Sequence, residues 1–180
     1  MADEQAAALK AMDLCRTLSG AELDAIAAIV ETREVAAGKD LFREGDPGDG
    51  LFLVISGEVN VTKRAPGGEH SLARLGPGGV LGEMSLVTAD ARSATGRALV
   101  DSRVLHVPAV RFRALLAADS VAAHKVVAAV AEVLARRLAT MNVAVLELSA
   151  KAGILAADVP SLGETQKMIA LHRKMQIWSF

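Results

Sequence analysis

The sequence has little of several features that mark particular classes of protein. Cysteine occurs once in 180 residues, as Cys15, so no disulfide can form within the chain. Cys15 follows the apolar Leu14, which favours a buried structural thiol over a reactive nucleophile. The formal net charge is −1, whereas nucleic-acid-binding proteins usually present a clustered basic face. The composition therefore gives no support to a disulfide scaffold, a thiol enzyme or an electrostatic DNA binder.

Long uninterrupted hydrophobic runs are also lacking. The segment from Met1 to Asp13 has neither the basic start nor the apolar stretch of a secretory signal. The Ala/Val-rich stretch from Val121 to Leu138 is interrupted too often for a membrane span, by His124, Lys125, Glu132, Arg136 and Arg137. Since 52% of the residues are hydrophobic and 23% are charged, we expect a folded, cytoplasmic chain with no membrane partner.

Patterns typical of metal sites and of catalysis are missing as well. The four histidines show no metal-ligand spacing, and no His-x-His pair precedes a carboxylate as in a metal-dependent barrel enzyme: His70, His106, His124 and His172. The serine and threonine residues have no evident general base nearby in the sequence. We therefore predict no metal, no catalytic residue and no enzymatic activity.

Turn residues and apolar periodicity divide the chain into four segments. The second segment has short apolar runs between Gly- and Pro-rich turns, which is typical of a barrel or sandwich of short strands. The predicted fold class is α+β, with an antiparallel β-roll or jelly-roll barrel flanked by helices. The segments are an N-terminal helical region (1–34), the barrel (35–108), the following helices (109–150), and a linker with an amphipathic terminal helix (151–180).

Several helices have recognisable ends or faces. Ser19, followed three residues later by Glu22, predicts a capping box at the start of a helix, and Pro108 ends the β region before a short helix. A long helix is predicted from about Ser120 to Ser149. Its apolar stripe has steps of four and three residues, namely Val130, Leu134, Leu138, Met141, Val145 and Leu148. We expect its first half to join the core, and its second half to form either a core face or a dimer seam.

The terminal helix also has an apolar face. Ser161, with Glu164 three residues later, predicts its capped start. Its face consists of Met168, Leu171, Met175 and Trp178, which we expect to dock on the barrel or the long helix.

The most informative stretch is residues 80–96. Gly82 precedes a short helical turn, so the backbone there can approach a ligand and its N–H groups can receive an anion. Arg92 offers a planar fork that matches phosphate oxygens, and Glu83 can accept a hydrogen bond from a sugar hydroxyl. Together they predict a nucleotide site. The alternative is a structural ion pair, which at a surface contributes only about 0–1 kcal/mol.

Two runs resemble the phosphate-binding cassette of the cyclic-nucleotide-binding domain family, namely Gly82-Glu83-Met84-Ser85-Leu86 and Arg92-Ser93-Ala94. Catabolite activator proteins, regulatory subunits of cyclic-nucleotide-dependent kinases and gated channels share this domain. Glycines outside the cassette agree in order and spacing, in Ala37-Gly38, Glu44-Gly45-Asp46 and Ser56-Gly57-Glu58-Val59. The resemblance extends from about Leu14 to Asn142 and implies a β-roll that binds cAMP or cGMP.

By this resemblance, Glu83 holds the ribose 2′-hydroxyl, Arg92 holds the cyclic phosphate, and Ser93 adds a hydroxyl near the phosphate or base. The other expected ligand-binding residues lie in the cassette or on the long helix: Gly82, Met84, Ser85, Ala94, Thr140, Met141 and Asn142. The choice between cAMP and cGMP depends on contacts from the long helix, whose register the sequence does not fix.

Three residues depart from the family pattern. Gly79 stands where the family often has Asp, Leu81 where an aromatic is common, and Gly96 where a β-branched residue is usual. We expect these differences to affect packing and affinity more than the identity of the ligand.

Three functions remain open. The first is a stand-alone cyclic-nucleotide sensor that acts through an unknown protein effector, with a homodimer through the long helix as a further possibility. The second is a transcription regulator of the catabolite activator type, and the third is a ligand-free interaction module with the same fold. Because residues 143–180 are too few for the rest of the long helix and a helix-turn-helix, the sequence favours the sensor, with no DNA partner.

Overall fold

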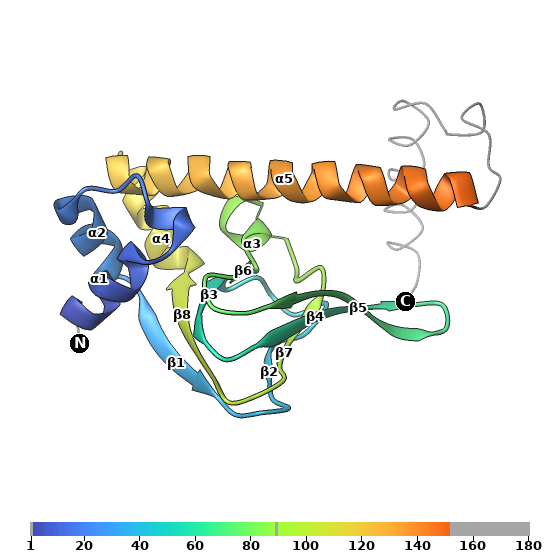
Figure 1. Cartoon of the computed structure of the whole chain (residues 1–180). Coiled ribbons are helices and arrows are strands. Elements are labelled where there is room, and N and C mark those ends of the chain that lie inside the picture. The colour runs from blue at the N-terminus through green and yellow to red at the C-terminus, as the bar shows by residue number, and fades with distance from the viewer. Residues whose placement is uncertain (1, 89, 152–180) are drawn as a thin grey trace, which may run out of the picture. The chain divides into compact units, whose positions relative to one another are not determined.

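Two antiparallel four-stranded sheets and the helices around them make up the first part of the chain in the computed structural model, which describes residues 2–88 and 90–151 (Figure 1). Contacts within the chain divide it into two units, Met1–Val133 and Leu134–Phe180, which are described separately. The predicted α+β class is confirmed.

The first sheet has the strand order β1-β8-β3-β6, and the second has the order β2-β7-β4-β5. The strands of the first sheet are β1 (Glu31–Val35), β8 (Ser102–Pro108), β3 (Gly50–Ser56) and β6 (Val80–Leu81). Those of the second are β2 (Asp40–Phe42), β7 (Thr95–Ala98), β4 (Val59–Ala65) and β5 (Gly68–Leu75). The sheets are not closed into a barrel, because β1 and β6 stay edge strands of one sheet, and β2 and β5 of the other. The expectation of a barrel is corrected on this point.

The N-terminal region contains α1 (Ala2–Lys10), a 3₁₀ turn η1 (Asp13–Cys15) and α2 (Gly20–Ala27). The capping box of α2 is confirmed: the Glu22 N–H donates to the Ser19 hydroxyl over 3.4 Å, and the Ser19 N–H donates to the Glu22 carboxylate over 2.7 Å. Strand β1 begins at Glu31, before the expected boundary at residue 35.

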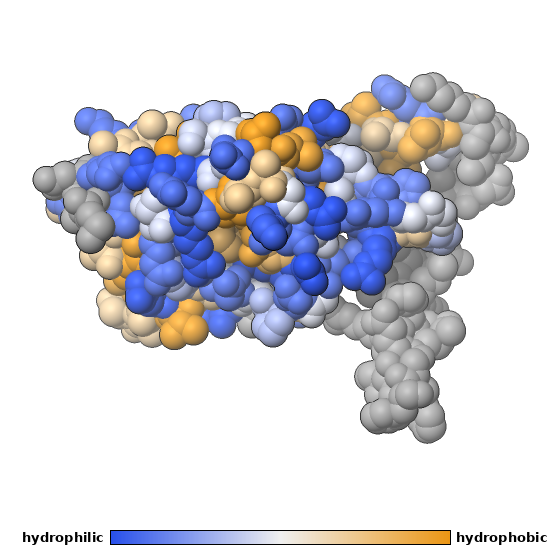
Figure 2. Space-filling view, turned by 90° about the horizontal axis from the view of Figure 1, so that it is seen from below, coloured by the Kyte–Doolittle hydropathy of each residue, from blue (hydrophilic) through white to orange (hydrophobic). Residues whose placement is uncertain are grey.

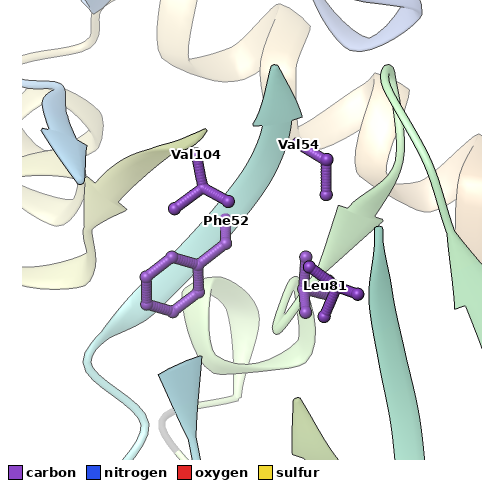
Figure 3. Packing of buried hydrophobic residues seen from close by; sticks show 5 residues of the cluster. Phe52, Val54, Leu81 and Val104 are labelled. Atoms are coloured by element: carbon purple, nitrogen blue, oxygen red, sulfur yellow. The ribbon is translucent and has the colours of Figure 1, made fainter. Parts of the chain in front are cut away.

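The core between the sheets is formed by large apolar side chains from both (Figure 3). Its buried members are Phe52, Val54, Val59, Leu81 and Val104. All residues from Gly50 to Val54 are buried, and successive strand residues point to opposite faces, so both faces of β3 are covered. Burying one such side chain contributes about 1.5–3 kcal/mol, which explains why this strand is almost continuously apolar.

Pro108 precedes α4 (Ala109–Ala117), and α5 (Val121–Lys151) follows, as the sequence predicts. Within the first unit, the beginning of α5 buries Ala122, Ala123, Val126 and Val130. In the second unit, the stripe residues Leu138, Met141, Val145 and Leu148 are exposed by 56–65%. The predicted terminal helix, with Ser161 and Trp178, lies outside the described residues.

No single helix among residues 2–88 and 90–151 is both long and apolar enough to span a bilayer, although α4 and α5, bent by 120° at their junction, pass that test as a pair. On the face shown in Figure 2, hydrophobic residues occupy small areas between hydrophilic ones.

Candidate functional site

The cassette begins with a sharp turn after β6. Gly82 has a φ of +75°, a conformation that glycine adopts without steric cost, and it leads directly into α3 (Met84–Val87). The Ser85 N–H donates to the Gly82 carbonyl over 3.2 Å, and the Leu86 N–H donates to the Glu83 carbonyl over 3.1 Å. These bonds form a tight helical turn, and α3 packs against β3 and α4.

Arg92 is the central side chain of the cassette, and only 1% of it is exposed. Its Nη1 donates to the Gly82 carbonyl over 3.2 Å and to the Ser85 hydroxyl over 3.1 Å. Its Nη2 donates to a carboxylate oxygen of Asp49. The guanidinium lies over the Phe42 ring, with Cζ 4.1 Å from the centroid, a distance suited to a cation–π contact. Arg92 is therefore fixed by the cassette, the β2–β3 loop and the core.

The β2–β3 loop also holds the backbone of Arg92. The Arg92 N–H donates to the Asp46 carbonyl over 2.8 Å, and the Gly45 N–H donates to the Arg92 carbonyl over 2.9 Å. Gly48 lies against the cassette so closely that a β-carbon there would be 2.5 Å from the Ser85 hydroxyl oxygen. The loop and the cassette therefore form one packed structure, although about 40 residues of sequence separate them.

The electrostatics of Arg92 reflect its burial. Loss of solvent lowers the pKa of the Arg92 guanidinium, and the hydrogen bond and charge of Asp49 oppose that shift, with smaller contributions from the charges of Glu83 and Asp46. Arginine keeps its charge in proteins, so the site presents a buried cation. Its Nε is buried and has no hydrogen-bond acceptor in the described part of the chain. This remaining donor fits an anionic ligand.

The residues expected in the cassette do not all face the guanidinium. Gly82, Ser85 and Arg92 are hydrogen-bonded to one another, and Glu83 is buried beside them, with 5% exposure. Ala94 is buried as well. Met84 is 44% exposed and receives the Ser93 hydroxyl at its sulfur over 3.7 Å, so these two residues lie at the outer side of the cassette.

The long-helix residues Thr140, Met141 and Asn142 are helical and exposed, and the Thr140 hydroxyl donates to the Arg136 carbonyl over 3.1 Å. They belong to the second unit, so their predicted position near a nucleotide base stays a prediction.

Sequence reasoning missed three contributors to the site: Asp49, Phe42 and His106. Asp49 lies between Gly48 and Gly50, and an acid between two glycines can approach other backbone closely, which is a sequence signal. His106 interrupts an apolar run in β8, which is a sequence signal, but its neighbours come from distant segments.

Two of the departures from the family pattern, Gly96 and Leu81, pack against each other. A β-carbon at Gly96 would be 3.0 Å from the Leu81 side chain and 3.1 Å from the Phe42 ring. The missing side chain at Gly96 therefore leaves room for the Phe42 ring, which makes the cation–π contact with the Arg92 guanidinium.

A cavity of about 480 Å³ is lined by residues that include Thr95 and Arg97, but by none of the residues that contact the Arg92 guanidinium. Because Gly96 faces the core, its neighbours in β7 point to the opposite face of the sheet. The arginines at this cavity are partly neutralised, since Asp40 accepts from Arg43 over 2.8 Å and from Arg97 over 2.6 Å. The described residues contain no cluster of three or more His, Cys, Asp or Glu that could hold a metal.

Comparison with known proteins is consistent with this geometry. Residues 32–119, which include the cassette and both sheets apart from Glu31, match the model of the family described as cyclic nucleotide-binding domain. The chain is 37% identical over 131 residues to the "Cyclic AMP receptor protein" of Thermus thermophilus. This alignment covers 72% of this chain and 59% of that protein. It is 30% identical over 145 residues to the "CRP-like cAMP-activated global transcriptional regulator" of Mycobacterium tuberculosis, covering 78% and 60%.

Among solved structures, the N-terminal domain of a transcriptional regulator from Streptomyces coelicolor is 32% identical, with a TM-score of 0.60, and covers 75% of this chain and 94% of that one. The chain thus spans about 60% of the length of these two curated relatives, and nearly all of the solved N-terminal domain.

Proposed function

Because the chain belongs to the cyclic nucleotide-binding domain family, we propose that it binds one molecule of cAMP or cGMP at the cassette, with Arg92 as the phosphate ligand. The observation that carries this proposal is the buried guanidinium of Arg92, which donates hydrogen bonds to Gly82 and Ser85 and lies over the ring of Phe42. A cyclic phosphate is a monoanion, and a planar guanidinium can donate two parallel hydrogen bonds to its oxygens.

The phosphate binds by partner exchange in this proposal. Arg92 is 1% exposed and already donates to Asp49, whose own side chain is 52% exposed. An incoming phosphate therefore has to displace Asp49 or share the guanidinium with it. The exposed carboxylate can move into solvent at low cost, whereas Arg92 is held from several sides. Binding thus replaces one anion on Arg92 by another and moves the Asp49 side chain.

The remaining roles follow from the chemistry of the side chains. Glu83 accepts a hydrogen bond from the ribose 2′-hydroxyl, and Ser93 contributes its hydroxyl near the phosphate or base. We propose that Thr140, Met141 and Asn142 on α5 contact the base. Such contacts would set the preference between cAMP and cGMP. The site binds its ligand and does not transform it.

The signal passes to other proteins in this account. The chain acts as a cyclic-nucleotide sensor with a protein effector, and it forms a homodimer through the second half of α5. Support for the dimer comes from the exposed stripe of Leu138, Met141, Val145 and Leu148, whose heptad-like spacing suits a helix pair.

A second candidate is a transcription regulator of the catabolite activator type. It is favoured by the names of the relatives in Thermus thermophilus and Mycobacterium tuberculosis, which are a cyclic AMP receptor protein and a transcriptional regulator. Gel-shift experiments on genomic fragments, with and without cAMP, separate the two. A sequence-specific, nucleotide-dependent shift supports the regulator, and weak salt-sensitive retention or none supports the sensor.

Mass spectrometry of small molecules released from the purified, denatured protein tests the ligand class. We expect cAMP or cGMP in wild-type preparations and neither in preparations of Arg92→Ala. Recovery of a different nucleotide, at one per chain and dependent on Arg92, would contradict the proposed ligand while keeping the site.

A further inference from the structure

His106 lies between two carboxylates in the interior of the first sheet. It is 3% exposed, and its ring stacks on Phe52 with centroids 4.6 Å apart. Its Nε2 is 3.5 Å from an oxygen of Asp49, and its Nδ1 is 3.7 Å from an oxygen of Glu31. Neither ring nitrogen has a hydrogen-bond partner in the described part of the chain. A neutral imidazole can donate from only one nitrogen, whereas an imidazolium can donate to both acids.

The position of Asp49 beside His106 is fixed by the backbone. The Asp49 carbonyl accepts from the Ala109 N–H over 2.8 Å, and Gly50 follows with a φ of +150°. A β-carbon at Gly50 would be 2.8 Å from Nε2 of His106. Glycine at this position therefore lets the start of β3 approach β8 closely enough for the Asp49 carboxylate to face the imidazole.

Asp49 is shared between the histidine and the ligand site. One carboxylate oxygen accepts from Arg92, and the other faces Nε2 of His106. Any change in the charge of His106 therefore acts on the Asp49 carboxylate, which competes with a ligand phosphate for Arg92.

Charged groups of both signs surround His106. They are Glu31 and Arg33 from β1, Asp49 from the β2–β3 loop, Arg92 from the cassette through Asp49, and Arg111 from α4 through its 3.1 Å ion pair with Glu31. Burial, and secondly the charge of Arg33, lower the pKa of His106 below its usual 6.5, while Asp49 and Glu31 oppose this shift. Because this pKa lies below 6.5, His106 is mainly neutral at pH 7.

We propose that His106 is a positioning residue for Asp49, and that its protonation strengthens the binding of the anionic ligand at Arg92. This inference rests on the proposed function of the cassette. When His106 is neutral, the charge of Asp49 is directed at Arg92 and competes with the phosphate. When His106 is charged, it attracts Asp49 away from Arg92 and adds positive potential to the site.

The direction of the pH dependence follows from linkage. A proton on His106 favours the bound phosphate, so by reciprocity the bound phosphate raises the pKa of His106. Ligand affinity is therefore highest below the pKa of His106 and falls as the pH rises through it. A rise of about half to one pKa unit on binding corresponds to an affinity change of roughly 3- to 10-fold.

Calorimetric titration with cAMP between pH 5 and pH 8 tests the inference. We expect the wild type to bind about 3- to 10-fold more tightly at pH 5 than at pH 7.5, and His106→Asn to bind equally at both. The matched control is His70→Asn, which removes an exposed histidine on β5 and should keep the wild-type profile. An unchanged pH profile in His106→Asn would overturn the proposal.

A second measurement does not need the His106 variant or the ligand. NMR titration of the histidine ring signals in the free protein should show that Asp49→Asn lowers the pKa of His106 further, because a favourable negative charge is lost. No change would contradict coupling between the two residues. If cAMP fails to bind at any pH, the proposed function fails instead. If it binds with one affinity at all pH values in wild type and His106→Asn alike, only the present inference fails.

Discussion

Nη1 of Arg92 donates to the carbonyl oxygen of Gly82 over 3.2 Å and occupies the space that a β-carbon on Gly82 would need. The close approach is possible only because residue 82 lacks a side chain and adopts a φ of +75°. The turn and the ligand-binding arginine therefore depend on each other.

Gly82→Ala is expected to lose cAMP binding and to destabilise the fold. The left-handed conformation alone costs an alanine about 1–2 kcal/mol, and the clash with Arg92 adds to this cost. The matched control is Gly78→Ala, because Gly78 also has a positive φ, of +84°, but no atom within 4 Å of its would-be β-carbon. Calorimetry and thermal unfolding should show binding kept in Gly78→Ala and lost in Gly82→Ala. Equal effects in the two variants would mean that the approach of Arg92 is unimportant.

Arg92→Ala should weaken cAMP binding more than Glu83→Ala. Arg92 faces a full anionic charge, so its removal is expected to cost about 2–5 kcal/mol of binding free energy, whereas the bond from a neutral hydroxyl to Glu83 is worth about 1.5–3 kcal/mol. Arg64→Ala serves as the control, since Arg64 is an exposed arginine on β4 at the separate cavity. Dissociation constants of the three variants give the order, with thermal unfolding as the check on folding. A nearly silent Arg92→Ala would place the phosphate elsewhere.

The acid stability of the second sheet should depend on Asp40. The hydrogen bond and charge of Arg97, and then those of Arg43, hold the pKa of the Asp40 carboxyl below its usual 3.8. A lowered pKa in the folded state means that the stabilisation is present above pH 4 and is lost as the pH falls through the folded-state value. Asp40→Asn should therefore lower the free energy of unfolding by roughly 1 kcal/mol at pH 7. The difference from wild type, followed by urea unfolding, should shrink toward pH 2. A constant difference over this range would show that ionisation of Asp40 is not its source.

Cys15 should be almost inert in the native protein. It is 2% exposed, and burial raises the pKa of its thiol to about 11, so the reactive thiolate is scarce at neutral pH. Labelling with a thiol reagent at pH 8 should be slow in buffer and rapid in denaturant. Fast labelling under native conditions would contradict the packing of the 3₁₀ turn η1.

Local signals made much of the fold predictable. Ser19 and Glu22 give the capping box, Pro108 separates β8 from α4, and turn glycines such as Gly57 divide the strands. These features act over a few residues, so the sequence alone reveals them. The separation of the strands into two open sheets was not predicted, because it depends on which distant edges pair, for example β1 with β8.

The site was predictable in part for the same reason. Gly82, Glu83 and Arg92 lie within one cassette, where order and spacing identify them. Asp49 contacts Arg92 from 43 residues away in the chain, and His106 is connected to Arg92 only through Asp49. In the local sequence, Asp49 is typical of a turn and His106 only interrupts an apolar strand. Only the packing of the β2–β3 loop against β8 shows that they belong together.

The most direct test of the central claim is a calorimetric titration of nucleotide-free wild-type protein with cAMP and with cGMP, together with thermal unfolding. The account predicts saturable binding of at least one of them at about one molecule per chain. It also predicts a stabilisation of about 2.7 kcal/mol when the free ligand is 100 times its dissociation constant, and neither effect in Arg92→Ala. No heat and no shift in Tm with either nucleotide at millimolar concentration would contradict the account and leave a fold without its ligand.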